Sequence, residues 1–312
     1  MFDRLIDADF DAYLPAKQRS NVYNRERLDT KQRLGPLAEA LSTALIGTDG
    51  AQLEASWSLE HPHLVNRKQV EAQHVYFSRG ETARRALDTI IDRARGVASL
   101  LEDSTPQRSH VHLAVSLLSD RLEVALRLHP EATVDRQNLL RRCQDPYALA
   151  HLVSLVTSLP DGFVGGVVPD VQPARLLDGV ALAEQLRRFG TASQQSASLF
   201  SFVRSRPRAD VLAAGSGVVA MLAGDLAALL PLYRYCAWSR DNDFVSVKEA
   251  LEKKQTERRQ KGIVRGDEVR VVRGLFSGQL GTVQEVDPRG ALRLLVGKMT
   301  IKLDAADVER RA

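Results

Sequence analysis

The chain is poor in the residues that build disulfide frameworks and cysteine-based metal sites. Its 312 residues include two cysteines, Cys143 and Cys236, which lie far apart. Isolated cysteines argue against a disulfide framework or a cysteine-based zinc site, and they are typical of a reducing compartment. Residues 1–7 hold an acid within their only short apolar stretch, which is not typical of a signal peptide. We therefore expect a cytoplasmic protein.

Common catalytic motifs are also missing from the sequence. There is no Gly-x-x-x-x-Gly-Lys-Ser/Thr loop to hold nucleotide phosphates, no Gly-x-Ser-x-Gly nucleophile elbow and no His-Glu-x-x-His zinc motif. These absences favour a protein that is not an enzyme and that needs no cofactor.

One long apolar stretch, residues 211–238, is rich in Ala, Leu and Val. It contains Asp225, a Gly-Ser-Gly break at 215–217 and Pro231, all of which are costly in hydrocarbon. We expect a buried core helix here and no membrane partner.

Charge is distributed unevenly along the chain. Hydrophobic residues make up 44% of the sequence, enough for a sizeable core, and the net charge is +4. Residues 250–312 hold fourteen Lys and Arg against nine Asp and Glu, whereas the rest of the chain holds 29 basic and 30 acidic residues. All of the positive excess therefore lies in the tail, as expected for a polyanion-binding appendage on a neutral body.

The body, residues 1–245, has helical spacing before and after a group of strand-like segments. Because strands and helices do not alternate regularly, the pattern predicts an α+β fold: a helix-rich body with a small antiparallel sheet. The predicted helices are 25–45 (after an Asn24 cap), 82–101, 135–143, 145–156, 176–189 and 218–238, and the predicted strands are 53–59, 70–77 and 199–203.

The clearest local prediction is a hairpin over residues 109–129. A two-residue turn at Ser119 and Asp120 pairs Leu118 with Arg121 and gives one uniformly apolar face. The other face carries His110, His112 and His129, which at that separation are candidate ligands of a divalent metal. The alternative is a half-exposed polar face that happens to be rich in histidine.

Residues 246–262 are almost wholly polar and predict a charged linker. Beyond them, residues 264–287 alternate apolar and polar positions on both sides of a glycine-marked turn. Gly278 and Gly281 lie where a tight connection needs positive φ or close backbone approach. Further short strands follow to residue 303, about enough for a small closed barrel.

The core of this tail reads Gly-Asp-x-Val-x-Val-x-x-Gly-x-Phe-x-Gly-x-x-Gly-x-Val from Gly266 to Val283. It resembles the KOW motif of NusG-type transcription factors and of some ribosomal proteins. The resemblance implies an SH3-like barrel over residues 263–312 that contacts RNA, DNA, the ribosome or RNA polymerase.

Two sets of residues are candidates for contact with nucleic acid. In the tail, the cations are placed to meet phosphate and Phe276 to stack on a base or to enter a protein pocket; the alternative is that the arginines only solvate a barrel and Phe276 plugs its end. Near the N-terminus, Tyr23 and two asparagines are interleaved with cations, as suits contact with the phosphates and bases of a nucleic acid; the alternative is a capped helix start. The candidate cations are Arg265, Arg270, Arg273, Arg289, Arg293, Lys298 and Lys302 in the tail and Lys17, Arg19 and Arg25 near the N-terminus.

These patterns favour a non-enzymatic protein of transcription, translation or RNA handling, tethered through its tail. A metal-dependent nuclease or hydrolase built on the hairpin histidines is the competing hypothesis. A third hypothesis is a structural protein that self-associates through residues 218–232.

Overall fold

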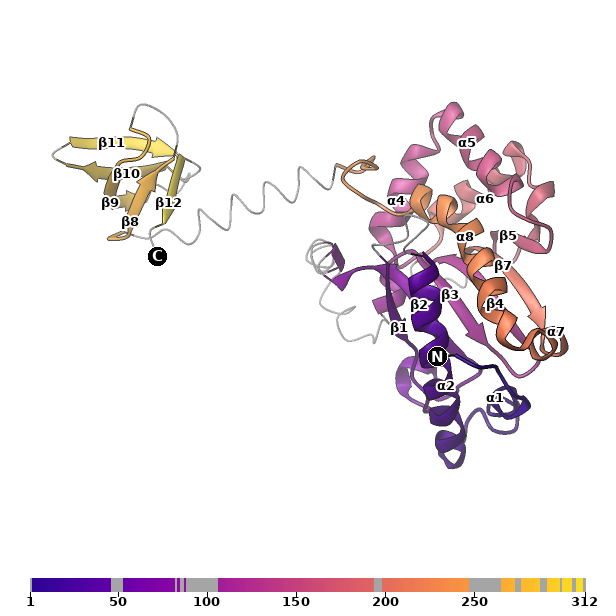
Figure 1. Ribbon diagram of the computed structural model, residues 1–312. Helices are drawn as coiled ribbons and strands as arrows, with labels where there is room; N and C mark the ends of the chain where they lie inside the picture. The colour runs from indigo at the N-terminus through magenta and orange to yellow at the C-terminus, as the bar shows by residue number, and fades with distance from the viewer. Residues whose placement is uncertain are drawn as a thin grey trace. The chain divides into compact units, whose positions relative to one another are not determined.

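The computed structural model divides into two compact units, Met1–Val245 and Ser246–Ala312 (Figure 1). The structure describes residues 2–45, 53–81, 83–84, 87, 106–193, 198–246, 265–272, 276–286, 291–297, 299–304 and 307–310. The first unit is called the body and the second the tail unit. The predicted helix 82–101 and the predicted linker 246–262 lie almost wholly outside the described residues.

The body is built on one antiparallel sheet of seven strands, in the order β1-β2-β3-β4-β7-β5-β6. Every strand pair is antiparallel, which confirms the α+β prediction. The strands are β1 Leu53–Trp57, β2 Gln73–Arg79, β3 His112–Leu117, β4 Arg121–Leu128, β5 Phe163–Val167, β6 Gln172–Pro173 and β7 Phe200–Pro207.

The central hairpin, β3–β4, has the predicted register. Leu117 pairs with Leu122, and the Leu118 amide donates to the Arg121 carbonyl oxygen at 2.9 Å. Ser119 and Asp120 therefore form the turn. Because side chains alternate across a strand, this register places Val115 and Val124 together on the apolar face.

Helices pack on that apolar face and at one end of the sheet (Figure 1). The most apolar long helix, α8, contacts β3, β4, α2, α4 and α5, and its Leu222, Leu226 and Leu229 are fully buried. The helices are α1 Asp7–Asp11, α2 Asn24–Leu45, α4 Thr133–Arg142, α5 Pro146–Thr157, α6 Gly179–Thr191, α7 Arg208–Ala214 and α8 Val218–Cys236.

The stretch Arg208–Cys236 is the one described helical stretch long and apolar enough to cross a membrane, by length and composition alone. Three-residue 3₁₀ geometry at Gly215–Gly217 separates α7 from α8. Asp225 of α8 is buried and accepts hydrogen bonds from Arg204 at 2.8 Å and from Arg206 at 3.0 Å. Most of the larger side chains of α8 are buried in the core of the body. They include side chains within residues 218–232, the segment of the self-association hypothesis.

Two body strands, β5 and β6, escaped prediction because glycines interrupt the pattern of β5 and because β6 is only two residues long and ends in Pro173. β5 contains Gly165 and Gly166, and a side chain at Gly165 would meet the Phe202 ring at 2.2 Å. The close approach of β7 therefore requires glycine in a segment that reads as a loop. β7 itself extends to Pro207, four residues beyond the predicted strand end.

The tail unit is a five-stranded antiparallel sheet in the order β11-β10-β9-β8-β12. Its strands are β8 Glu268–Val271, β9 Leu280–Val286, β10 Ala291–Val296, β11 Met299–Asp304 and β12 Val308–Arg310. Within the described residues no strand pairing joins β11 to β12, so the sheet is open. The prediction of a closed barrel is therefore wrong. The last strand is only three residues long and pairs with β8 alone.

Candidate nucleic-acid interface

The two-residue period of the tail sequence separates its core from its charged surface. Val269, Val271 and Val283 are buried, and Leu292 and Leu294 join them on the same face. The residues between them point to solvent, as strand geometry requires.

Both glycines singled out in the tail have the predicted kind of role. Gly278 has φ +87°, a conformation that side-chain-bearing residues rarely adopt. A side chain at Gly281 would lie 2.8 Å from Cγ2 of Val296 and 3.1 Å from the Leu295 carbonyl oxygen. These contacts hold β9 close against β10.

Of the predicted tail cations, the sheet register brings two together. Arg293 of β10 pairs directly with Lys302 of β11, and both are exposed. Like charges directly opposite each other weaken a sheet unless an anion compensates them. Glu285 of β9 lies on the other side of Arg293, 3.3 Å from its guanidinium, with both side chains more than 60% exposed. A solvated ion pair of this kind contributes little to stability, and Arg293 and Lys302 both stay exposed, where phosphate can reach them.

The other predicted tail cations do not join this pair in the described residues. Arg270 lies on β8, where Glu309 of β12 is its cross-strand partner, and Arg265 lies in the turn before β8. Both are exposed. The remaining three, Arg273, Arg289 and Lys298, lie outside the described residues.

Phe276 is half-buried rather than extended from a loop tip. Its ring packs against the tail core formed around Val269 and Leu294. Part of the ring therefore serves the fold, as the plug alternative predicts, and the stacking role stays a prediction.

The basic run near the N-terminus is largely engaged within the body. Lys17 pairs with Glu26 at 2.5 Å and lies 5.2 Å from the centre of the Tyr23 ring, while Arg19 donates to Gln69 at 3.3 Å. Arg27 is fully buried and donates to the carbonyl oxygen of Lys17. Arg25 is exposed. For Lys17 and Arg19, this geometry favours the capped helix start over a contact with nucleic acid.

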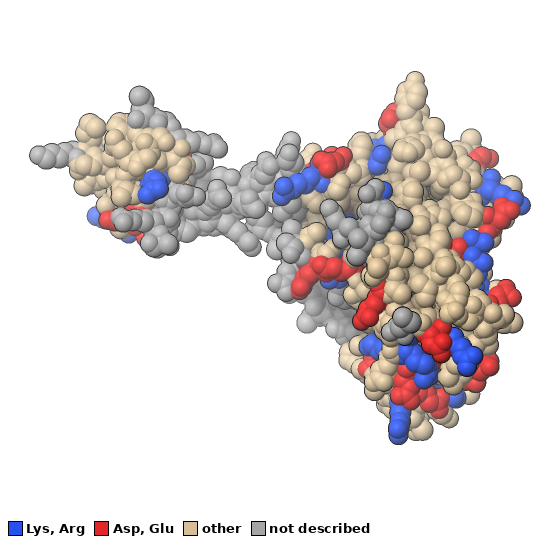
Figure 2. All heavy atoms as spheres, viewed as in Figure 1, with Lys and Arg blue, Asp and Glu red and all other residues tan. Residues whose placement is uncertain are grey.

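Figure 2 agrees with that conclusion. On the face it shows, acidic and basic side chains of the body lie side by side at the end that carries α1 and α2. Interspersed charges of both signs are typical of a solvated surface rather than of a site for a polyanion.

Two of the three hairpin histidines are buried and His129 is half-buried, so the alternative of a half-exposed polar face is wrong for His110 and His112. His110 and His112 are 2% and 1% exposed. The His112 Nδ1 atom lies 3.1 Å from the His110 carbonyl oxygen, and its ring stacks on His129 with centroids 5.8 Å apart. Burial lowers the pKa of His112 to about 4, so its ring is neutral at physiological pH.

Nor do these histidines assemble a metal site. Among the residues that the structure describes, no group of three or more His, Cys, Asp or Glu side chains is placed to hold a metal ion. The stacked rings and the internal hydrogen bond instead make a packed layer on the second face of the sheet.

Comparison with known families agrees with the geometry of the tail. Residues 265–296 match the family model of the KOW motif. The chain carries a KOW motif. The match covers β8, β9 and β10, which include Arg270 and Arg293. No curated protein matches the chain. The KOW motif points to an interaction with nucleic acid or ribosomes, and it leaves the body unassigned.

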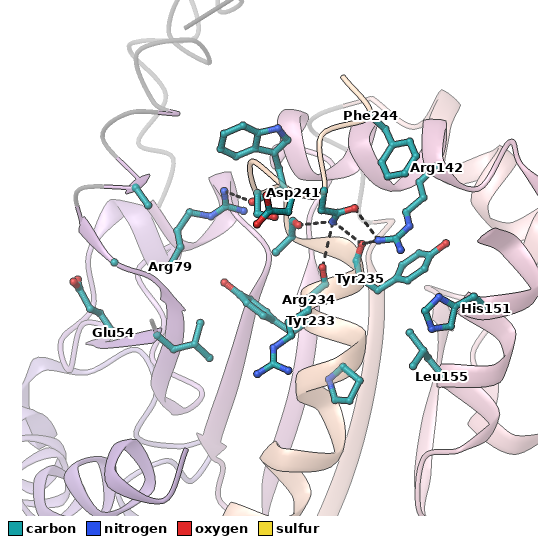
Figure 3. Close-up of a pocket in the computed structure, with 18 residues that line it drawn as sticks. Glu54, Arg79, Arg142, His151, Leu155, Tyr233, Arg234, Tyr235, Asp241 and Phe244 are labelled. Atoms are coloured by element: carbon teal, nitrogen blue, oxygen red, sulfur yellow. Dashed lines mark hydrogen bonds between the residues drawn. The ribbon is translucent and has the colours of Figure 1, made fainter. Parts of the chain in front are cut away.

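Sequence reasoning missed a groove of about 990 Å³ in the body. It lies where the ends of β1 and β2, the end of α4, helix α5 and the end of α8 meet (Figure 3). The usable signal was the run Tyr233-Arg-Tyr235-Cys-Ala-Trp238, an aromatic cluster at the end of an apolar helix. The predicted helix 218–238 places that run in the core, although Tyr233, Tyr235 and Trp238 also line the groove.

Proposed function

We propose that this protein is a non-enzymatic binding protein whose KOW unit attaches it to a nucleic acid, free or within a ribonucleoprotein. The match of residues 265–296 to the KOW motif carries the proposal. The positive excess of residues 250–312 and the exposure of Arg265, Arg270, Arg293 and Lys302 support it independently. The isolated cysteines favour action in the reducing cytoplasm.

Phosphate is the group that the cations of the KOW unit suit best. The pair Arg293–Lys302 offers two positive charges on one sheet face, and Arg270 and Arg265 add charge on β8 and before it. Such contacts position a nucleic acid without reading its sequence. Each phosphate neutralised releases counterions, so the affinity falls steeply as salt rises. Phe276 adds a partial aromatic surface for a base beside this region.

Fluorescence anisotropy with the full-length chain tests the proposal. The probes are a labelled RNA hairpin and a labelled DNA duplex, each at low and at physiological salt. The double variant Arg293→Gln, Lys302→Gln removes the paired cations without changing the core. The matched control is Arg175→Gln, Arg187→Gln, which removes the same charge from exposed positions of the body.

We expect the KOW variant to bind about tenfold more weakly than wild type and to reduce the slope of log affinity against log salt by about two. The control variant should bind as wild type does. An equal loss of affinity in the KOW variant and in the control variant would show that binding depends only on the net charge of the chain. Failure of the wild type to bind either probe at low salt would refute direct contact with nucleic acid.

The partner itself can be found by co-purification of the tagged chain with and without residues 253–312. We expect ribosomal or polymerase components to be retained by the full chain and lost on truncation. Their retention by both forms would place the attachment in the body and not in the KOW unit.

A further inference from the structure

The groove of the body holds an arginine whose guanidinium is fixed in place. Arg142, at the end of α4, has its charged group 3.7 Å from the centre of the Tyr235 ring and 5.4 Å from that of Phe244 (Figure 3). One nitrogen, Nη1, donates to Asn242 Oδ1 at 2.7 Å and to the Tyr235 carbonyl oxygen at 3.3 Å. Ring contacts and hydrogen bonds together hold the plane of the guanidinium.

The partners of Arg142 are themselves anchored. The Asn242 side chain donates to the carbonyl oxygen of Ala237 at 2.7 Å, directly after α8. The Phe244 amide donates to Oδ1 of Asn138, one turn before Arg142 on α4, at 2.8 Å. The segment after α8 is thus held against α4 by hydrogen bonds. Because its partners are fixed, Arg142 loses little further conformational freedom when it binds a ligand.

One edge of the guanidinium remains for a ligand. The Nη1 atom makes both of the hydrogen bonds to protein acceptors, and in the described part of the chain Arg142 forms no ion pair. The edge formed by Nε and Nη2 is the fork that binds a phosphate or carboxylate through two parallel hydrogen bonds. Because its bound acceptors are neutral, the positive charge of Arg142 is uncompensated at the groove wall.

The other charges near the groove are more nearly balanced. Arg79 pairs with the buried carboxylate of Asp135, and Glu54 pairs with Arg84 at 3.6 Å. Arg234 and Asp241 also line the groove and bring one charge of each sign. The surplus charge therefore sits on Arg142, and the groove as a whole favours an anion.

Aromatic rings supply the second half of a binding site. Phe244 is 47% exposed although its backbone is fixed, and Trp238 lines the same groove. A flat ring that stays exposed beside a fixed cation suits a ligand with both a planar base and a phosphate. The volume lies at the upper end of the range for small-molecule sites, which accommodates a nucleotide.

We propose that this groove binds a nucleotide unit, with its phosphate on the Nε–Nη2 edge of Arg142 and its base against the exposed face of Phe244 or Trp238. The nucleotide is either free or part of a single strand, because both present the same base and phosphate. The site lies within the body and is independent of the KOW unit.

Fluorescence of Trp238 in the full-length chain tests the proposal. The chain has two tryptophans, so Trp57→Phe leaves Trp238 as the single reporter. The titrants are adenosine monophosphate, a five-nucleotide single-stranded RNA and inorganic phosphate. The variants are Arg142→Gln, Arg142→Lys and Phe244→Ala, and the matched control is Arg141→Gln, an exposed neighbour on α4 that does not line the groove.

We expect adenosine monophosphate to bind, with affinity reduced about tenfold or more by Arg142→Gln, because the two charged hydrogen bonds are lost. Arg142→Lys should be intermediate, since a lysine keeps the charge without the fork. Arg141→Gln and the KOW variant Arg293→Gln, Lys302→Gln should leave this binding unchanged, which separates it from the proposed function of the tail.

Binding of the RNA without the mononucleotide would assign the site to a nucleic-acid strand. Equal affinity for phosphate and for adenosine monophosphate would overturn the role of the base. No binding of any titrant, or unchanged binding in both Arg142→Gln and Phe244→Ala, would overturn the site itself. If Arg142→Gln fails to give a cooperative thermal transition, Phe244→Ala and Arg142→Lys still decide the outcome.

Discussion

Asp135 is a buried carboxylate that joins four parts of the body. It is 1% exposed and pairs with Arg79 at the end of β2. Its Oδ2 accepts from the Val111 amide before β3, and its Oδ1 accepts from the Trp238 amide after α8, both at 2.8 Å. The substitution Asp135→Asn keeps the size of the side chain and removes the charge. It leaves the Arg79 guanidinium buried without its counter-ion and turns an amide N–H₂ group toward existing donors.

Breaking one side of a buried ion pair typically costs about 3–5 kcal/mol. In a body of this size, the free energy of unfolding falls by about 3 kcal/mol per molar urea. The urea concentration at the unfolding midpoint should therefore fall by about 1 M or more. Both tryptophans lie in the body, so urea denaturation followed by tryptophan fluorescence reports on the body alone.

The matched control for this prediction is Asp161→Asn. Its carboxylate pairs with Arg175 at 2.6 Å, but both side chains are more than 60% exposed, so the expected cost is below about 1 kcal/mol. Adding Arg79→Met to Asp135→Asn should recover part of the lost stability, because neither member of this ion pair then leaves an unpaired buried charge. The reasoning is refuted if Asp135→Asn lowers the midpoint no more than Asp161→Asn does.

Two further predictions concern the KOW unit and the buried histidines. Gly281→Val should open the β9–β10 pairing, because its Cβ would lie 2.8 Å from Val296; hydrogen exchange of the tail amides should accelerate, and unchanged protection would contradict the close approach. Burial lowers the pKa of His112 to about 4, below its unfolded value of about 6.5. The unfolded chain therefore binds the proton more readily, so His112 supports stability above about pH 6.5 and costs up to about 1.4 kcal/mol per pH unit as the pH falls toward 4. His112→Gln should flatten the pH dependence of the urea midpoint over that interval, and an unaltered dependence would exclude this ring as its source.

Local sequence signals predicted those elements whose pattern arises within one segment. The helix ending at Leu45, the hairpin register of β3–β4 and the helix α8 all follow from side-chain periodicity and a turn or cap. β5 was missed because Gly165 is required by the ring of Phe202, a residue 37 positions later whose approach no local pattern reveals. The contacts of Arg142 were hidden for the same reason, because its partners Tyr235, Asn242 and Phe244 are about a hundred residues away.

The sequence by itself determined the α+β class, the KOW motif and the concentration of positive charge in the tail. Each of these depends on composition or on spacing within a short segment. Only the tertiary structure decided that His110 and His112 are buried and that Lys17 and Arg19 are engaged within the body. It also decided that Arg293 meets Lys302 and that Arg142 carries an uncompensated charge in a groove. Burial and partnership depend on which distant segments pack together, and that packing is a property of the whole fold.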